Sequence, residues 1–178
     1  MFTKYGKALQ LKGLFGKIKD SSQNLYAVLL TSVNSISDTV SACTGYEEVA
    51  ATTTVNGTAY SNGYARQQLV KWNSSQNNFE SVFGSPAEGT GDDAGYVVIK
   101  NTQAIEFPEN YNETLDQNVD LNGGNAIGYF GVVDALSGGN LVAYWALGAD
   151  AITVSASDAI KPTIRAGKMV FRVAPDAA

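Results

Sequence analysis

The chain has no histidine and a single cysteine, Cys43, among its 178 residues. The absence of histidine excludes Ser-His-Asp and Cys-His nucleophile systems, the usual proton shuttle near pH 7 and every histidine-containing metal site. One cysteine can form neither an internal disulfide nor a four-cysteine zinc site. These absences exclude most familiar enzyme chemistries and fit a reducing cytoplasm, or a particle assembled in one.

Charge, proline and long apolar runs are also scarce. Charged residues make up 16% of the chain and there are only 4 prolines, whereas soluble domains have roughly 25% charged residues. No apolar run reaches about 18 residues, so we expect no membrane-spanning helix. The N-terminal residues lack the apolar core of a signal peptide. A chain of this length is expected to form one domain with a buried core.

The basic residues are unevenly distributed. Residues 1–19 carry five lysines and no acidic residue, and the remaining chain has 7 basic and 17 acidic residues, a net charge of −10. An acidic body of this kind argues against nucleic acid as a partner. We therefore consider the basic N-terminal segment separately from the rest of the chain.

Residues 4–19 are predicted to form an amphipathic helix. Leu11, Leu14, Phe15 and Ile18 follow the spacing of one apolar helix face. The sequence predicts an arm or helix over residues 1–20 and a single β-sandwich domain over residues 21–178. Packing on the body or on a partner is favoured for this arm over binding to a membrane surface or nucleic acid. The residues predicted to form an interface are Phe2, Lys4, Lys7, Lys12, Leu14, Phe15, Lys17 and Lys19.

The body has the signals of strands and turns. Residues 25–32 (LYAVLLTS) form an apolar run too short for a helix, which predicts a buried strand. Residues 126–134 and 141–147 are two more strand-length runs, and the Gly and Asn residues at 137–140 predict a hairpin turn between them. Weaker patterns predict strands at 64–72, 96–99, 104–107, 152–154 and 169–173.

Three polar stretches, residues 33–62, 73–94 and 108–125, are predicted to be loops, with one helical turn near residues 46–49. Several short strands separated by turns, with one convincing helix, predict a mainly all-β fold. We expect an antiparallel β-sandwich, jelly-roll-like in its strand order, with a short N-terminal helix or arm.

Carboxylates are the only acid–base groups left for catalysis. Asp92-Asp93 and Glu47-Glu48 are adjacent pairs, but glycosidases place two carboxylates across a cleft. Both pairs are interpreted as solvated turn charges, and a carboxylate-based hydrolase is the least favoured function. The oxygen-rich stretch 116–123 is similar to the first half of a calcium loop, yet the twelfth-position Glu is missing. An Asx-rich turn is the favoured interpretation there.

Aromatic residues provide an alternative binding surface. Trp72, Trp145, Tyr144, Tyr129 and Phe130 are candidates for a sugar-stacking platform. Tyr144 and Trp145 are adjacent on a predicted strand, so they should point to opposite faces of the sheet. Core packing is therefore the favoured role for these aromatic residues.

Several segments together are similar to a known family. They are Tyr5–Leu9 with Leu14-Phe15, 25–31, Gly63–Arg66, 131–135 with 138–141, 144–147, Ile152–Asp158 and Ala166-Gly167. In this order they resemble small virion proteins of tailed bacteriophages, described as capsid decoration (cement), head-fibre or tail-fibre-like proteins. The resemblance implies a β-sandwich structural protein with no catalytic, cofactor-binding or metal-binding residues.

This resemblance leads to two hypotheses. The first is a non-enzymatic decoration protein on the outside of the head, bound to the major capsid protein and stabilising its lattice. Its subunits are expected to form a homo-oligomer, with trimers suited to three-fold shell positions. The alternative is a tail or head-fibre component, or a carbohydrate-binding module for host recognition that uses Trp72 or Tyr111.

Overall fold

The computed structural model describes residues 24–34, 39, 41–73, 75–76, 78–84 and 87–173. Over these residues the chain is mainly β, and every strand pairing is antiparallel. The helical segments within the described residues are three-residue 3-10 turns. They are η2 (Gly91–Asp93), η3 (Asn122–Gly124) and η4 (Gly148–Asp150).

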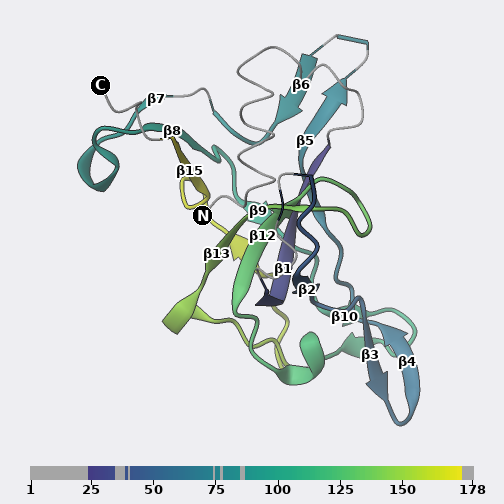
Figure 1. The fold of residues 1–178 in the computed structure, drawn as a ribbon. Helices are drawn as coiled ribbons and strands as arrows, with labels where there is room; N and C mark the ends of the chain where they lie inside the picture. The colour runs from purple at the N-terminus through teal and green to yellow at the C-terminus, as the bar shows by residue number, and fades with distance from the viewer. Residues whose placement is uncertain are drawn as a thin grey trace.

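The principal sheet contains six strands and occupies the centre of the molecule (Figure 1). Its main path is β13 (Leu141–Ala146), β12 (Tyr129–Val133), β1 (Leu25–Val33), β5 (Gln67–Asn73) and β6 (Asn78–Ser81). The sixth strand, β2 (Tyr46–Glu48), also pairs with β1. Strands β5 and β2 pair with opposite ends of β1, while β12 pairs along its length.

Four smaller sheets surround the principal one. A three-stranded sheet contains β15 (Val170–Val173), β8 (Val97–Lys100) and β7 (Ala87–Glu88). The three two-stranded sheets pair β3 (Thr52–Val55) with β4 (Thr58–Ser61), β9 (Ile105–Glu106) with β14 (Thr163–Ile164), and β10 (Tyr111–Asn112) with β11 (Gln117–Asn118).

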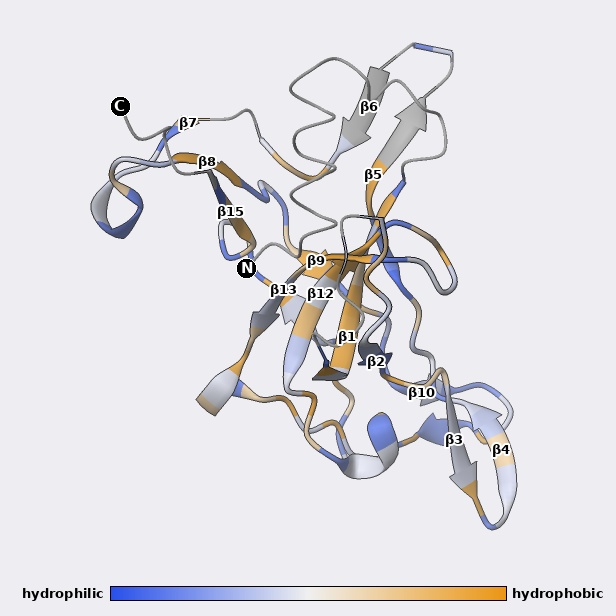
Figure 2. Ribbon diagram, viewed as in Figure 1, coloured by the Kyte–Doolittle hydropathy of each residue, from blue (hydrophilic) through white to orange (hydrophobic). Residues whose placement is uncertain are grey.

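Strand β1 is the centre of the hydrophobic core, as its apolar sequence predicts. Residues Tyr26 to Leu30 are all buried, and β1 is among the most hydrophobic strands in Figure 2. Because successive side chains on a strand point to opposite faces, burial of five consecutive residues requires cover on both faces of the sheet. Ala27 and Leu29 pack in one core cluster, while Val28 and Leu30 pack in another.

The larger core cluster also contains Phe107, Phe130 and Met169, which come from three widely separated segments. The smaller cluster contains Cys43 and Leu141. Tyr144 and Trp145 pack against different clusters, the smaller and the larger respectively, so the predicted opposite orientation of these two side chains is confirmed.

The predicted hairpin near the C-terminus is confirmed. Strands β12 and β13 pair from Tyr129↔Ala146 to Val133↔Leu141. Gly138 and Gly139 in the connecting loop have φ angles of 61° and 86°, which glycine adopts without a steric penalty. The predicted strands at 25–32, 64–72, 96–99, 104–107 and 169–173 correspond to β1, β5, β8, β9 and β15. The predicted strand at 152–154 was wrong, because Ile152 forms only an isolated bridge with Ile127.

Several loop predictions were wrong. Residues 33–62 contain β2, β3 and β4, and the predicted helical turn at 46–49 is strand β2. Asn56 and Gly57 have φ angles of 49° and 80° and connect β3 to β4, as in the Asn-Gly hairpin turns of β proteins. Residues 73–94 contain β6 and β7, and residues 108–125 contain β10 and β11. The mainly β, antiparallel fold class is confirmed, and the jelly-roll strand order stays a prediction.

Buried asparagines fasten the loops to one another. Asn110 is fully buried; its Nδ2 donates to the carbonyl oxygens of Val119 and Ser155, and its Oδ1 accepts from the Ile160 N–H. Asn62, Asn101 and Asn112 are also buried and form similar side-chain hydrogen bonds to the backbone. Buried polar groups are tolerated when they are hydrogen-bonded in this way, so short strands and long connections can form one ordered body.

Candidate functional site

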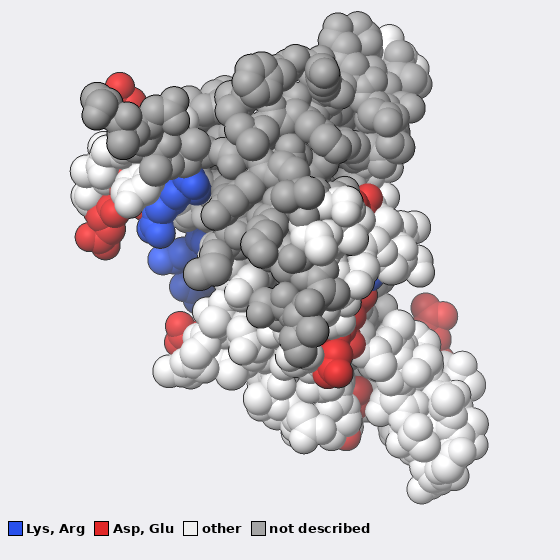
Figure 3. Space-filling view, in the orientation of Figure 1, with Lys and Arg blue, Asp and Glu red and all other residues white. Residues whose placement is uncertain are grey.

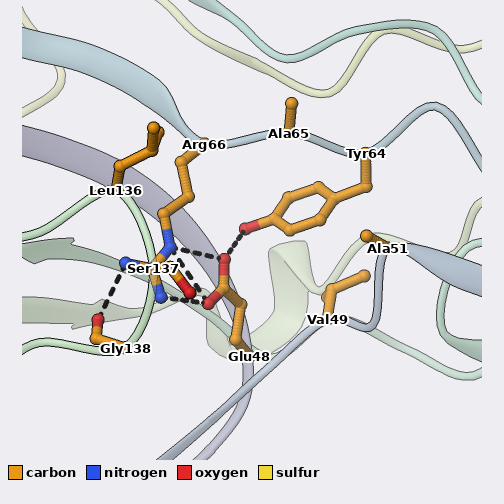
Figure 4. A pocket seen from close by; sticks show the side chains of 9 residues that line it. All are labelled: Glu48, Val49, Ala51, Tyr64, Ala65, Arg66, Leu136, Ser137 and Gly138. Carbon is orange, nitrogen blue, oxygen red and sulfur yellow. Dashed lines mark hydrogen bonds and ion pairs between the residues drawn. The ribbon is translucent and has the colours of Figure 1, made fainter.

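Three segments place charged and polar side chains beside the β12–β13 loop. Glu48 is the last residue of β2, and Tyr64 and Arg66 lie on the segment that connects β4 to β5. The loop itself spans residues 134–140. Figure 4 shows Tyr64 and Arg66 pointing toward the Glu48 carboxylate from one side.

Glu48 and Arg66 form a largely buried ion pair. The Arg66 Nη2 lies 2.5 Å from Glu48 Oε2, and the Arg66 Nε lies 2.9 Å from Glu48 Oε1. The two side chains are 6% and 22% exposed for Arg66 and Glu48 respectively. The Tyr64 hydroxyl donates to Glu48 Oε1 at 2.8 Å and accepts from the Leu29 N–H at 3.0 Å. The network therefore connects β1, β2 and the β4–β5 connection.

The electrostatics of this network keep Tyr64 and Arg66 in their ordinary protonation states. Burial of the Tyr64 phenol raises its pKa, and the neighbouring Glu48 carboxylate raises it further. Burial alone would lower the pKa of Arg66, but its hydrogen bonds to Glu48 and the charge of that carboxylate outweigh burial and raise it. A general acid or base needs a pKa near the working pH. Tyr64 and Arg66 are therefore suited to structure rather than to proton transfer.

Arg66 also holds the β12–β13 loop in place through hydrogen bonds to its backbone. Its Nη1 donates to the carbonyl oxygens of Ala135 at 2.5 Å and Gly138 at 2.8 Å. The Tyr46 hydroxyl donates to the Gly138 carbonyl at 2.9 Å and lies 3.2 Å from the Gly139 carbonyl. These contacts occupy carbonyl groups at both ends of the loop tip, so its conformation is held by side chains from outside the hairpin.

A second set of hydrogen bonds closes the base of the same loop. Asp134 Oδ1 accepts from the Asn140 N–H at 2.6 Å, and Asp134 Oδ2 accepts from Asn140 Nδ2 at 3.1 Å. Asn140 Oδ1 in turn accepts from the Cys43 N–H at 3.1 Å. A Cβ atom at Gly139 would lie 2.6 Å from Asp134 Oδ1, so this close approach requires glycine.

The fixed loop presents an exposed apolar side chain beside a hollow. Leu136 is 67% exposed, the highest value among the large exposed hydrophobic residues of the described chain. It borders a pocket of about 330 Å³ whose other apolar wall contains Val49, Ala51 and Ala65 (Figure 4). Burial of an exposed leucine side chain in an interface is favourable, and a side chain held in place beforehand loses less entropy on docking. We call Leu136 and this hollow the Leu136 surface.

A separate ion-pair cluster fixes η2 to the three-stranded sheet. Asp93 is buried, and its carboxylate accepts from Lys100 Nζ at 3.0 Å and from Arg172 Nε. Hydrogen bonds from Lys100 and then from Arg172 lower the pKa of Asp93. Figure 3 shows Lys and Arg side chains gathered on the side of the molecule that carries β8 and β15.

The two members of each carboxylate pair noted in the sequence have different environments. Glu48 and Asp93 form buried or partly buried ion pairs, so the interpretation of both pairs as solvated turn charge was wrong for these two members. Glu47 and Asp92 are exposed. Glu48 is bound by Arg66, and Asp93 is bound by Lys100 and Arg172. One carboxylate of each adjacent pair is therefore held in an ion pair, and neither pair presents two carboxylates to one substrate.

The oxygen-rich stretch 116–123 begins at the last residue of the β10–β11 turn, includes strand β11 and ends within η3, so it is not one continuous ion-binding loop. The Asp116 carboxylate accepts from the Tyr111 hydroxyl, and Asp120 Oδ1 accepts from the Ala156 N–H. Within the described residues there is no group of three or more acidic or cysteine side chains placed to hold a metal ion. The positive φ angles of Asp116 and Asn122 are those of an Asx-rich turn.

The aromatic residues at the C-terminal hairpin belong to the core. Trp145 stacks on Phe130 at a centroid distance of 4.8 Å and contacts the edge of Phe171. Tyr129 and Tyr144 contact each other on the opposite side of the sheet. Core packing was the favoured prediction for these residues and is confirmed. The side chain of Trp72 lies outside the described part of the structure.

The predicted arm interface lies outside the described residues. This holds for the boundary at residue 20, for the helix at 4–19 and for every predicted interface residue, namely Phe2, Lys4, Lys7, Lys12, Leu14, Phe15, Lys17 and Lys19. The Leu136 surface was missed by sequence reasoning. Its signal is Arg66, the first basic residue after Lys19, because an isolated arginine in an uncharged segment is often paired and buried.

A scan of protein-family models finds none that matches this chain, and a search of curated proteins finds no significantly similar sequence. Among the described residues, no helix has the length and apolar character required to cross a membrane.

Proposed function

We propose that this chain is a non-enzymatic virion structural protein, specifically a decoration (cement) protein of a bacteriophage head. In this role it binds the outside of the shell, contacts the major capsid protein and stabilises the capsid lattice. The resemblance of the sequence segments to small phage virion proteins motivates the proposal. The mainly β, antiparallel fold is compatible with it.

The observation that supports a binding role most directly is the Leu136 surface. Arg66, Tyr46 and Asp134 hold the loop in one conformation while Leu136 stays 67% exposed at its tip. A leucine of this kind gains free energy when a partner covers it, about 1.5–3 kcal/mol if it becomes fully buried. Rigid support reduces the entropy lost on binding, so this surface is suited to docking on a large, preformed partner such as a capsid.

Co-sedimentation with purified heads that lack this protein tests the proposal. We expect the wild-type chain to sediment with heads and Leu136→Ser to bind at least about tenfold more weakly, since a buried leucine anchor is lost. Thr114→Ala is the control, because Thr114 is exposed in the β10–β11 turn and does not line the hollow beside Leu136. We expect this control to bind like the wild type.

Two results would contradict the proposal at different levels. Equal binding by Leu136→Ser and Thr114→Ala would remove the Leu136 surface from the contact. A wild-type chain that ignores heads but binds host glycans or tail structures would favour the fibre or carbohydrate-binding alternative.

The basic arm is tested by the same assay. The proposal expects a chain without residues 1–19 to remain folded and to lose head binding. Binding that survives this deletion would show that the predicted arm residues are not the capsid contact.

A further inference from the structure

The β3–β4 hairpin projects from the lower end of the molecule (Figure 1). Residues 49–65, which contain the hairpin and both of its flanks, have no charged residue and no proline. Figure 3 shows the corresponding surface as uncharged. Thr52, Thr54, Ala59 and Ser61 are exposed. The hairpin is therefore a protruding, uncharged β ribbon in a chain whose net charge is −5.

The register of the hairpin decides which backbone groups point outward. A two-residue Asn56-Gly57 loop joins the closing pair Val55↔Thr58. In such a hairpin the closing pair is hydrogen-bonded, and hydrogen-bonded and non-hydrogen-bonded pairs then alternate. Thr54↔Ala59 is therefore a non-hydrogen-bonded pair, and so is Thr52↔Ser61. The N–H and C=O groups of these four residues point away from the partner strand.

The two edges of the hairpin differ. On the β4 edge, the Ser61 carbonyl accepts a hydrogen bond from Asn112 Nδ2. On the β3 edge, the outward groups of Thr52 and Thr54 have no hydrogen-bond partner among the described residues. The turn η3 lies near β3, but the described contacts include no hydrogen bond between them. Among the described residues, these ladder positions of the β3 edge therefore lack a hydrogen-bond partner.

Proteins usually protect free edges with a lysine, a proline, a bulge or a covering element. Strand β3 has the sequence Thr-Thr-Thr-Val, so it contains neither lysine nor proline. Its residues are all β-branched, and such residues favour strands. We propose that β3 pairs antiparallel with β3 of a second copy of this chain, about a two-fold axis at Thr53. Thr52 of one copy then lies opposite Thr54 of the other, and the pair forms four backbone hydrogen bonds.

A second copy fits this edge better than a charged partner does. Two copies of an acidic protein repel each other, so a contact between them needs an uncharged surface, and residues 49–65 provide one. The segment Thr52-Thr53-Thr54 reads the same in both directions, so a two-fold axis at its centre places threonine against threonine at every position. Cross-strand threonine pairs are favourable, and an isologous contact closes as a dimer.

Sedimentation of the full chain over a range of concentrations tests the pairing, with the Thr54→Pro and Ala59→Pro variants compared. Proline at either position removes an outward N–H and leaves the hydrogen bonds within the hairpin intact, which edge strands tolerate. We expect a weak, concentration-dependent dimer for the wild type and for Ala59→Pro. Thr54→Pro should weaken association at least about tenfold, since the dimer loses one hydrogen bond per copy and the proline ring obstructs the edge.

Oxidative cross-linking provides a measurement that does not depend on a proline variant. The two Thr53 residues face each other as a non-hydrogen-bonded pair, where Cα atoms are about 4.5 Å apart, within the range that a disulfide spans. Thr53→Cys should form a covalent dimer, and Thr58→Cys should not. A monomeric wild type at every concentration, equal cross-linking of both variants, or loss of the dimer in Ala59→Pro instead of Thr54→Pro would overturn the proposed pairing.

Discussion

Buried polar side chains carry much of the order of this protein at the level of single residues. Asn110 connects Val119, Ser155 and Ile160, while Arg66 connects Glu48 to the loop at residues 134–140. A buried donor or acceptor that loses its partner costs about 1–3 kcal/mol. Networks of this kind specify the positions of loops that apolar contacts alone leave undefined.

The Glu48–Arg66 pair is tested by Glu48→Gln. The variant keeps the shape of the side chain but leaves the Arg66 guanidinium, which is 6% exposed, without its opposing charge. Breaking a buried ion pair in this way costs about 3–5 kcal/mol. We therefore expect urea denaturation to show a loss of about 3 kcal/mol in the free energy of unfolding.

Glu47→Gln is the matched control, because Glu47 is the exposed neighbour of Glu48 on β2. Exposed substitutions usually change stability by less than about 0.5 kcal/mol. A Glu48→Gln variant as stable as this control would contradict the structural role of the ion pair.

The roles of these residues were only partly predictable from sequence. The pairing of Glu48 with Arg66 joins residues separated by 18 positions, and that of Asp93 with Arg172 joins residues separated by 79. No local pattern encodes such pairs, since they depend on which strands become neighbours.

At the scale of secondary-structure elements, the central strands of the principal sheet are tightly packed against each other. Gly131 on β12 lies opposite Val28 on β1 and Tyr144 on β13. A Cβ atom at this position would lie 2.9 Å from the Cδ1 atoms of both Leu30 and Leu141. The close packing of these leucines therefore depends on a residue without a side chain.

Gly131→Ala should consequently be destabilising. Overpacking of a well-filled core typically costs about 1–3 kcal/mol, and we expect a loss in this range by urea denaturation. Gly128→Ala is the control, because the nearest atom to its Cβ would be the Thr31 carbonyl oxygen at 3.9 Å. If both variants were equally stable, the proposed steric limit between β1 and β13 would be wrong.

The three-stranded sheet and η2 are coupled by Asp93, which makes their stability dependent on pH. The pKa of Asp93 lies below its ordinary value of 3.8 in the folded protein because Lys100 and Arg172 stabilise the carboxylate. The ion pairs therefore contribute stability above the unfolded-state pKa, and this contribution is lost as the pH falls through the folded-state pKa.

Asp93→Asn isolates this effect. We expect the wild type to be more stable than the variant near pH 6, and the difference to shrink as the pH falls from about 5 to about 2. Urea denaturation at several pH values measures both curves. A difference that stays constant over this range would show that protonation of Asp93 does not control the coupling.

Apolar runs made the long strands predictable, and Gly138-Gly139 marked the hairpin between β12 and β13. The β3–β4 hairpin was missed because its threonines and alanine resemble a polar loop in composition. The alternation of Thr53, Val55 and Tyr60 with more exposed neighbours, together with Asn56-Gly57, is the local signal that identifies it. Two-residue strands such as β10 and β11 give too short a pattern to be recognised.

The whole molecule combines a two-sided core with a weakly charged surface and long, well-fastened connections. Its described polar clusters are used to hold loops in place, and the Leu136 surface and the β3–β4 hairpin present uncharged groups to the outside. Surfaces of this kind suit repeated contacts in a symmetric assembly. They are compatible with the structural role on a phage head that the sequence resemblance motivates.

Immunogold electron microscopy of purified virions, with an antibody raised against this protein, tests the central claim most directly. A decoration protein predicts gold particles distributed evenly over the head. Gold confined to the tail or its tip, on particles whose heads are labelled by a capsid antibody, would contradict the proposal and favour a role in host recognition.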